Sequence, residues 1–433
     1  MWNCDDKGKN MFWQIPQSHV LRQLTTDGRL LFSTRVARMF AYGFLAVVLV
    51  LYLHEIGLSA SRIGMLLTLT LFGDTLVSLW ITTIADRIGR RRMLMVGAGL
   101  MLLAGVLFAL TTNYLLLVIA ATIGVISPSG YEVGPFLPIE QAALTQTVSS
   151  QQRTQVFAWY NLAGSLATAL GALLGGLVAQ LLVGAGLTQV ESYRVLLFLY
   201  AVAGLVLWLL FLRLSPAAEL PAVKQATTAP ALFSARFGLH RSLGIVLKLS
   251  ALFALDAFAG GFVLQSMVAY WFHLRFGVEP ALLGSIFFGA NILAGLSALA
   301  AAGVAARIGL INTMVCTHIP SNVLLILVPL MPNLPLAITM LLLRFSISQM
   351  DVPTRQSYTM AVVAPDELSA AAGVTGVART TGAALSPIFA GLLLANPALL
   401  SIPFFLAGGL KIVYDLLLYR SFRAIRPPEE VGR

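Results

Sequence analysis

Charge is the scarcest property of this sequence. Only 11% of its 433 residues are Asp, Glu, Lys or Arg, whereas soluble domains carry roughly 25% charged residues. Residues 93–131 and 154–190 contain no ionised side chain, and apolar runs of about 18 residues or more are typical of membrane spans. The sequence therefore predicts a polytopic membrane protein and excludes an array of soluble domains.

Motifs for disulfides, metals and nucleotides are also missing. Two cysteines, Cys4 and Cys316, are too few for a disulfide framework, and the five histidines show no metal-ligand spacing. The G-x-x-x-x-G-K-[ST] motif that cradles ATP phosphates is absent. We expect no cofactor and no enzyme activity, and we expect an ion gradient, most simply of H⁺, to supply any energy.

The sequence is rich in apolar segments of membrane length. We expect about twelve, since each is near the ~20 residues that a bilayer needs. An even number places both termini on one side, and the arginines after the last segment make that side cytoplasmic. The loops on the opposite side hold only Arg62, Arg194 and Arg275, so this asymmetry explains the net charge of +10 without nucleic-acid binding. The segments lie near 36–55, 62–84, 92–111, 114–137, 155–183, 195–213, 248–272, 283–305, 311–331, 335–356, 371–394 and 399–419.

The chain divides into two related halves. The widest polar interval runs from Arg213 to Lys248 and predicts a cytoplasmic linker between two six-helix bundles. Residues 86–89 align with 306–309, and 138–141 with 353–356, as expected for an internal repeat. We predict an all-α integral membrane fold with about twelve transmembrane helices in two pseudo-symmetric halves. The divisions are a cytoplasmic N-terminal segment (1–34), the N-terminal half (35–213), the linker (214–247), the C-terminal half (248–419) and a cytoplasmic tail (420–433).

The loop between the second and third segments carries a specific pattern. It fits G-x-x-x-D-R-x-G-R-[RK]-[RK], with Thr82 in place of the first glycine. This loop resembles the signature of the major facilitator superfamily. The resemblance implies alternating-access transport and a central cavity lined by helices 1, 4, 7 and 10. The matching residues are Asp86, Arg87, Gly89, Arg90, Arg91 and Arg92.

Charges at the expected cytoplasmic mouth are candidates for a gate. Asp86 should face the start of helix 11, near Ser369, where exposed amides and the helix dipole favour an anion. Glu140 and Arg355 occupy one repeat position with opposite signs, so we expect them to meet across the mouth. Asp351 precedes Arg355 by four residues, and we expect the two to share an ion pair.

Ionisable residues at membrane depth are functional candidates, because burying each costs at least ~2.5–3.5 kcal/mol. By the repeat, Glu132 on helix 4 and Arg344 on helix 10 lie within about one turn of the same depth. This suits a proton carrier beside a cation, and a static ion pair between the halves is the alternative. Asp256 on helix 7 competes with Glu132 for the proton role, and a gate contact with Arg35 or Arg38 is its alternative.

Other polar and aromatic residues extend this set of candidates. Lys411 and Asp415 are four apart on helix 12, and we expect them to neutralise each other. The further candidates for contact with substrate or proton are Arg38, Tyr42, Asp74, Trp159, Tyr160, Asn161, Gln265, Trp271, Asn291 and Arg379.

Helix 5 carries small residues at spacings that allow two helices to approach closely. Gly171, Gly175 and Gly176 fit a motif similar to the G-P-x-x-G-G of drug/proton antiporters, with Ala172 in place of proline. Helix 11 supplies Pro387 at the repeat position of Ala172. The resemblance favours export, and ordinary helix packing is the alternative.

Together these features predict a secondary transporter that exports a small amphipathic organic compound by proton coupling. One alternative is uptake of a polar or anionic metabolite, in which Arg344 and Arg379 bind the substrate. Another is a membrane sensor that does not transport. We expect a monomer in the inner or plasma membrane, with both termini cytoplasmic and with the bilayer and a small-molecule substrate as its partners.

Overall fold

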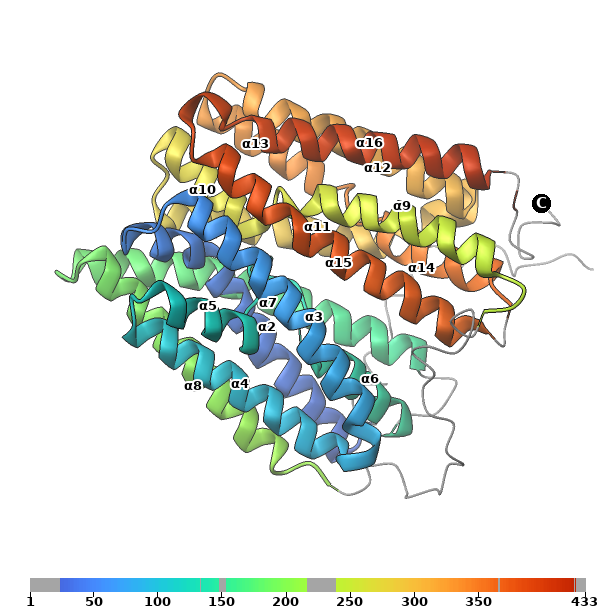
Figure 1. The fold of residues 1–433 in the computed structure, drawn as a ribbon, viewed down its shortest axis with the longest axis horizontal. Helices are drawn as coiled ribbons and strands as arrows, with labels where there is room; N and C mark the ends of the chain where they lie inside the picture. The colour runs from blue at the N-terminus through green and yellow to red at the C-terminus, as the bar shows by residue number, and fades with distance from the viewer. Residues whose placement is uncertain are drawn as a thin grey trace, which may run out of the picture.

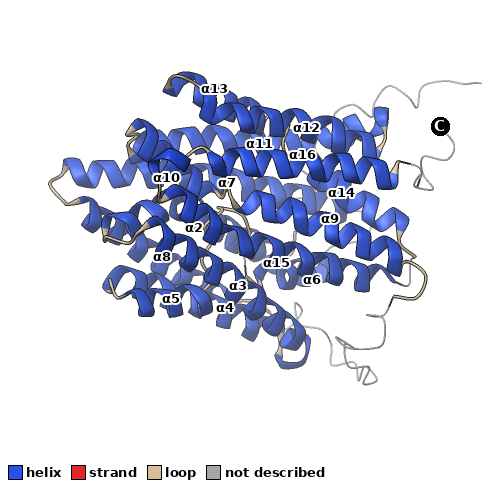
Figure 2. Cartoon of the chain, turned by 45° about the horizontal axis from the view of Figure 1, so that its top comes forward, coloured by secondary structure: helices blue, strands red, loops and turns tan. Residues whose placement is uncertain are grey.

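The computed structural model describes residues 24–132, 134–147, 153–215, 239–364, 367–423 and 425. Figure 2 shows them as helices joined by turns, with no strand in these ranges. The N-terminal half consists of α2 (Thr26–Glu55), α3 (Ala60–Ile88), α4 (Arg90–Leu110), α5 (Tyr114–Ile123), α6 (Phe136–Thr147), α7 (Arg153–Gly184) and α8 (Gln189–Phe211). The C-terminal half consists of α9 (Leu243–Gly261), α10 (Gln265–Phe276), α11 (Pro280–Ile308), α12 (Leu310–Leu327), α13 (Leu334–Phe345), α14 (Asp351–Val362), α15 (Leu368–Leu394) and α16 (Ile402–Phe422), with 3₁₀ turns η2 (Val328–Leu330) and η4 (Pro397–Leu399).

The helices account for about twelve membrane spans, as the sequence predicts. Ten helical segments are long and apolar enough to cross a bilayer. The shorter apolar helices α5 and α13 each continue, after a break, into α6 and α14. The first span starts earlier than the predicted boundary at residue 35, because Thr25 caps α2 by accepting a hydrogen bond from the Gly28 amide at 3.1 Å. Most of the predicted segments 1–34 and 214–247 lies outside the described residues.

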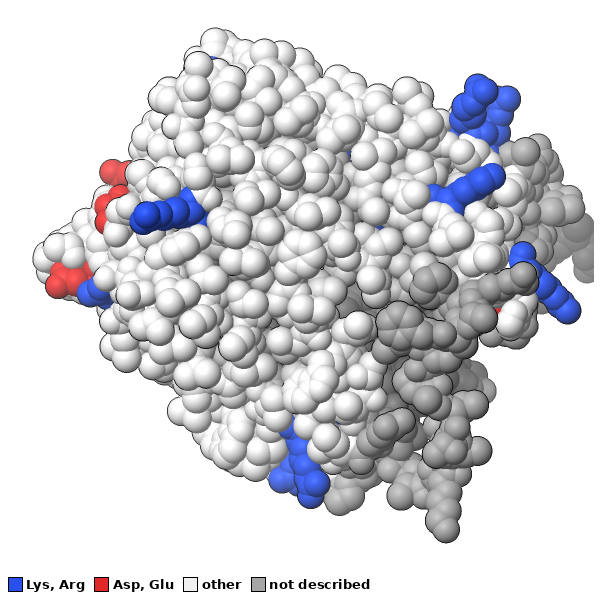
Figure 3. Space-filling view, viewed as in Figure 1, with Lys and Arg blue, Asp and Glu red and all other residues white. Residues whose placement is uncertain are grey.

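Charged side chains lie at the two ends of this bundle. On the face shown in Figure 3 the broad centre is uncharged, as a lipid-facing surface requires. One end, which we name the glutamate end, carries the exposed residues Glu55, Glu191 and Glu279 together with Arg62 and Arg275. The other, which we name the arginine end, carries the exposed residues Arg29, Arg92, Arg213, Arg241, Arg307, Arg420 and Arg423.

Three spans that the sequence predicts as continuous are broken near their middle. The breaks separate α5 from α6, α9 from α10, and α13 from α14. The first contains Pro128 and Pro135, which cannot donate a helical hydrogen bond, and Gly130 and Gly134, whose φ angles of 72° and 80° leave the right-handed helical region. Broken helices at membrane depth are tolerated where they line a cavity or are buried in protein.

The two halves pack tightly near the glutamate end. Figure 1 shows α3 of the N-terminal half beside α15 of the C-terminal half, and α7 packs on α11 in the same way. A Cβ atom on Gly64 would lie 2.4 Å from the Pro387 carbonyl oxygen, and one on Gly176 would lie 2.1 Å from the Pro280 carbonyl oxygen. Close approach of the backbones therefore requires glycine at both crossings. The Tyr270 hydroxyl, 3.1 Å from His54 Nδ1, adds a contact between α10 and α2.

Candidate functional site

A cavity of about 480 Å³ lies between the two halves. Its wall on the N-terminal side comes from α3 and the break between α5 and α6, and its wall on the C-terminal side comes from α9 to α16. All three helix breaks contribute lining residues, which accounts for irregular backbone at this depth. The permanently charged or acidic side chains on the wall are Asp74, Glu132, Asp256, Asp351, Arg344, Arg355, Arg379 and Lys411.

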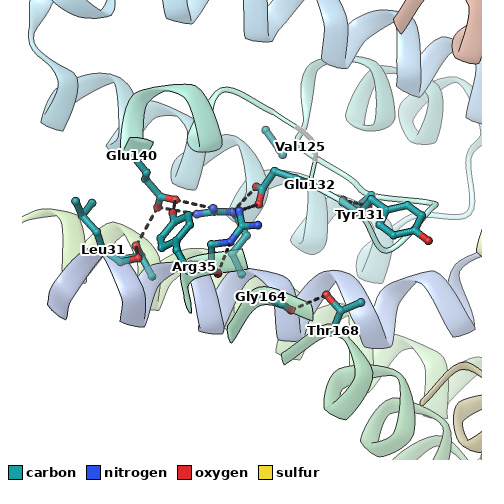
Figure 4. A network of polar contacts seen from close by, with 12 residues as sticks. Leu31, Arg35, Val125, Tyr131, Glu132, Glu140, Gly164 and Thr168 are labelled. Carbon is teal, nitrogen blue, oxygen red and sulfur yellow. Dashed lines mark hydrogen bonds and ion pairs between the residues drawn. The ribbon is translucent and has the colours of Figure 1, made fainter. Parts of the chain in front are cut away.

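In the N-terminal half, two arginines of α2 hold two glutamates (Figure 4). Arg38 donates from Nη1 and Nη2 to the two carboxylate oxygens of Glu140 at 2.8 and 2.7 Å, and from Nε to Glu132 at 2.8 Å. Arg35 forms an ion pair with the second oxygen of Glu132, and Tyr160 donates to Glu140. Two guanidinium groups thus face two carboxylates in a buried, hydrogen-bonded network, the arrangement that makes burial of charge tolerable.

In the C-terminal half, Asp256 of α9 is the centre of a second network. Its Oδ1 atom is 2.5 Å from Lys411 Nζ of α16, and its Oδ2 atom is 3.0 Å from Arg355 Nη1 of α14. The same Nη1 atom is 3.1 Å from Asp351 Oδ2, so Arg355 is shared between two aspartates. This network fastens α9 to α14 and α16 within one half.

Asp415 belongs to a neighbouring cluster and not to Lys411. His318 Nδ1 lies 2.8 Å from Asp415 Oδ1, and Asn322 Nδ2 donates to Asp415 Oδ2 at 3.2 Å. The expected local pair between Lys411 and Asp415 is therefore wrong, because Lys411 reaches the buried Asp256 on another helix. His318 Nε2 lies 3.9 Å from Asp256 Oδ1, so the imidazole links the two clusters.

Two expected contacts across the halves are corrected by these networks. Glu140 and Arg355 do not meet, because Glu140 is bonded to Arg38 and Arg355 to Asp256. Asp256 makes its ion pairs within its own half and none with Arg35 or Arg38 in the described part of the chain. Each half instead holds its own ion pair, and the repeat positions Glu140 and Arg355 carry opposite signs in the two pairs.

Three charged groups on the cavity wall have no ion-pair partner among the described residues: Asp74, Arg344 and Arg379. Asp74 Oδ1, Arg344 Nε and Arg379 Nε are each buried without a hydrogen-bond partner in that part of the chain. The expected pair of Glu132 with Arg344 is not formed, although both line the cavity, because Glu132 is bonded to Arg35 and Arg38.

The polar and aromatic candidates divide between wall and core. Gln265 lines the cavity at the start of α10, and its Oε1 accepts from Asn291 Nδ2 at 3.3 Å. Tyr42 and Trp271 are fully buried and are not among the lining residues. Tyr42 packs near Tyr200, with ring centroids 6.4 Å apart. Both aromatic rings therefore belong to the packed core and not to the cavity lining.

The signature loop forms the turn between α3 and α4 at the arginine end. Gly89 has φ of 115°, a conformation that favours glycine, and Arg90 follows it as a buried residue at the start of α4. The side chains of Asp86, Arg87 and Ser369 lie outside the described part of the structure, so the contact expected between Asp86 and the start of the eleventh span, α15, stays a prediction.

The glycines predicted on the fifth span lie on α7, at helix crossings. A Cβ atom on Gly171 would be 2.0 Å from the Phe40 carbonyl oxygen, and one on Gly175 would be 2.3 Å from Phe44 Cβ. These two glycines face α2, whereas Gly176 faces α11. Pro387 interrupts hydrogen bonding within α15, and the next amide, of Ile388, donates to Thr68 Oγ1 of α3 at 2.9 Å.

Outside the spans, Glu367 joins the segment before α9 to the start of α15. Its carboxylate accepts hydrogen bonds from the amides of His240, Arg241 and Ser242, the last two at 2.7 and 2.8 Å. The Arg241 amide is the largest of the influences that lower the Glu367 pKa to about 2. No group of three potential metal ligands occurs among the residues that the structure describes.

Comparison with known proteins gives one family. Residues 31–387 match the family described as the Major Facilitator Superfamily. The chain is 32% identical over 424 residues to the uncharacterized membrane protein YJR124C of Saccharomyces cerevisiae, covering 92% of this chain and 94% of that protein. It is 25% identical over 138 residues to the quinolone resistance protein NorA of Staphylococcus aureus, covering 32% and 34% of the two chains. The solved structure of the nucleoside transporter NupG has the same fold, with a TM-score of 0.71, 15% identity, and coverage of 92% and 100%.

Proposed function

The chain belongs to the Major Facilitator Superfamily, and from this membership we propose that it exports a small amphipathic organic compound in exchange for protons. Membership and fold make it a secondary transporter that works by alternating access. The substrate, the direction and the coupling ion are the proposed part.

The observation that carries this proposal is the mixed wall of the cavity between the halves. Apolar side chains such as Leu71, Phe287 and Phe345 line it together with carboxylates and cations. Small-molecule sites combine an apolar lining with a few polar groups that fix orientation. A compound with one apolar and one polar part matches such a wall.

The cavity also offers a candidate for the proton. Sequence reasoning favours Glu132, with Asp256 as its competitor, but each contacts two cations. Asp351 is bonded to Arg355. Asp74 has no described ion-pair partner, so it can gain or lose a proton without breaking an ion pair. We therefore place the exchanging proton on Asp74.

Export is favoured over uptake by the likeness to NorA, whose printed name describes quinolone resistance, and by the glycine motif of α7. The competing proposal is uptake of a polar or anionic metabolite. The observation in its favour is that Arg344 and Arg379 have no carboxylate partner among the described residues.

The test is transport by the purified full chain in liposomes under an imposed pH gradient. We expect amphipathic compounds to accumulate against their gradient when protons flow the other way, and we expect a protonophore to stop the accumulation. Movement only down the substrate gradient, unchanged by pH, would contradict proton coupling. Binding with no movement at all would favour a sensor.

A further inference from the structure

The two walls of the cavity have unmet hydrogen-bonding capacity of opposite kinds. On the C-terminal side, the buried polar atoms without a partner among the described residues are Gln265 Nε2, Arg344 Nε, Ser348 Oγ and Arg379 Nε. Each of these atoms can donate a hydrogen bond. On the N-terminal side, the corresponding atom is Asp74 Oδ1, an acceptor when ionised. The C-terminal wall is therefore suited to a ligand group that accepts hydrogen bonds.

The orientation of Gln265 follows from its neighbour. Asn291 Nδ2 donates to Gln265 Oε1 at 3.3 Å and to the Phe287 carbonyl oxygen at 2.9 Å. Because the Gln265 carbonyl oxygen is occupied, its NH₂ group is the part left for a ligand. Gln265 therefore presents a donor to the cavity.

The charge on the same wall points to an anion. Four cations of the C-terminal half line the cavity, and two carboxylates, Asp256 and Asp351, line it with them. Lys411 and Arg355 contact those carboxylates at 2.5 to 3.1 Å. Arg344 and Arg379 have no carboxylate contact in the described ranges, and the Arg344 guanidinium lies 5.0 Å from the centre of the Phe345 ring.

A guanidinium group with a buried Nε that has no hydrogen-bond partner is costly to the protein at membrane depth. Each buried donor without a partner costs about 1–3 kcal/mol, and more when the group is charged. A carboxylate, sulfonate or phosphate accepts hydrogen bonds from guanidinium groups in shortened, charge-assisted geometry. A cationic ligand would meet two positive charges on this wall, and an uncharged ligand would leave them unneutralised.

We propose that Arg344 and Arg379 form a subsite for the anionic group of an amphipathic substrate, with Gln265 and Ser348 as neutral donors. The apolar body of the substrate lies against the apolar part of the same wall, which includes Leu341 and Phe345. This inference rests on the proposed transport function, and it specifies the substrate as an organic anion.

The experiment measures binding to the full chain in nanodiscs of phosphatidylcholine, by calorimetry. The probes share one naphthalene body and carry a sulfonate, a carboxylate, a neutral hydroxymethyl group or an ammonium group. We expect the sulfonate and carboxylate probes to bind. The neutral and cationic probes should bind at least about tenfold more weakly, because losing one charge-assisted hydrogen bond weakens binding about tenfold or more. Equal binding of the neutral and anionic probes would overturn the inference without any mutation.

Variants locate the subsite. We expect Arg344→Gln and Arg379→Gln each to weaken binding of the anionic probes about 10- to 100-fold, and to change binding of the neutral probe by less than about threefold. Arg344→Lys should keep part of the preference, because it keeps the charge but loses the forked geometry. Arg420→Gln, at the exposed end of α16, is the matched control and should behave like the parent. If both Arg344→Gln and Arg379→Gln still prefer the anionic probes as strongly as the parent, the anionic group binds at another site.

Two further arms separate this inference from its alternatives. If adding phosphatidylglycerol to the nanodiscs abolishes probe binding, a lipid head group is the preferred occupant of the subsite, and its assignment to a free organic anion is overturned. Anion binding with no pH-driven transport would contradict the proposed function and leave this inference standing. Transport restricted to neutral or cationic compounds would do the reverse.

Discussion

Arg38 and Glu140 form a bidentate ion pair, with N–O distances of 2.8 and 2.7 Å, between two side chains that are 0% exposed. In the other half, Arg355, at the repeat position of Glu140, forms a pair with Asp256 at 3.0 Å. Each pair joins helices of one half. The halves can therefore move relative to each other without breaking either pair, which suits alternating access.

The first prediction concerns the energy of the Arg38–Glu140 pair. Removing one partner of a buried ion pair typically costs about 3–5 kcal/mol, because the other charge is left uncompensated. We expect Glu140→Gln to lower the unfolding temperature of the detergent-purified protein clearly. The double variant Arg38→Gln with Glu140→Gln should lose less than the sum of the two single variants, since Arg35 still holds Glu132. The measurement is thermal unfolding followed by intrinsic fluorescence.

A charge exchange provides the control. Glu140→Arg would face Arg38, and Arg355→Glu would face Asp256, so combining them should recover neither stability nor transport. Recovery in the double variant would show that Glu140 and Arg355 meet in another state of the protein. If the losses in unfolding temperature of Arg38→Gln and Glu140→Gln simply add in the double variant, the two side chains do not stabilise each other.

The fold could be predicted from composition because only a few kinds of secondary structure can span a bilayer. Uncharged runs of membrane length and an internal repeat are enough to give about twelve spans in two halves. The pattern of Asp86 to Arg92 gave the family, and the family match over residues 31–387 confirms it. The break between α5 and α6 is marked by Pro128 and Gly130. The break after Gly261 runs through Phe262, Val263 and Leu264, and this apolar sequence gives no sign of it.

The site was less predictable, because spacing along the chain does not give helix rotation. The repeat placed Glu132 and Arg344 at one depth, and both line the cavity, but only the packed structure shows that Glu132 faces α2. The spacing of four residues pairs Lys411 with Asp415, but the long side chain of Lys411 instead reaches Asp256. His318 was missed, although a lone histidine in an apolar helix is a signal of a buried polar partner.

The second prediction concerns orientation in the membrane. The arginine end should be cytoplasmic, because arginine and lysine collect in cytoplasmic loops. In a background with Cys4→Ser and Cys316→Ser, cysteines at Thr112 and Asn333 should react with an impermeant maleimide on intact cells. A cysteine at Arg420 should react only after the membrane is opened. The reverse pattern at all three positions would invert the topology.

The third prediction concerns the pH dependence of the Glu367 contact. Since its pKa is lowered from an ordinary 4.5 to about 2 in the folded protein, the ionised carboxylate stabilises the fold above about pH 4.5, and this contribution is lost as the pH falls towards 2. We expect Glu367→Gln to unfold at a lower temperature than the parent at pH 7. The difference should shrink at pH 3. Thermal unfolding at pH 7, 5 and 3 measures it, with the exposed Glu55→Gln as control.

A gap between Glu367→Gln and the parent that is equally large at pH 7 and pH 3 would contradict this assignment. It would mean that the shape of the side chain, and not its charge, holds the amides of residues 240–242. Glu55→Gln should match the parent at each pH, because Glu55 is exposed at the end of α2.

The last prediction concerns the coupling proton. The helices packed against α3 are α2, α4, α5, α6 and α15. The ionisable groups that interact electrostatically with Asp74 are Glu132 in the break after α5, Tyr42 on α2 and Tyr200 on α8, and Arg379 lines the same cavity. Arg38 is already bonded to two glutamates, and the polar contact to Asp74 comes from the Gly134 backbone.

Asp74 and Glu132 can therefore be distinguished by measuring substrate accumulation driven by a pH gradient. Asp74→Asn should abolish accumulation driven by a pH gradient and leave downhill exchange of substrate largely intact, because a neutral amide binds no proton in this range. Glu132→Gln and Asp256→Asn break ion pairs, so they should lower the unfolding temperature, and the protein that remains folded should still respond to the pH gradient. The parent, the three variants and a protonophore control are compared in the same liposomes. If Asp74→Asn concentrates substrate normally while Glu132→Gln does not, the proton is carried by Glu132, and Arg35 and Arg38 must release it during the cycle.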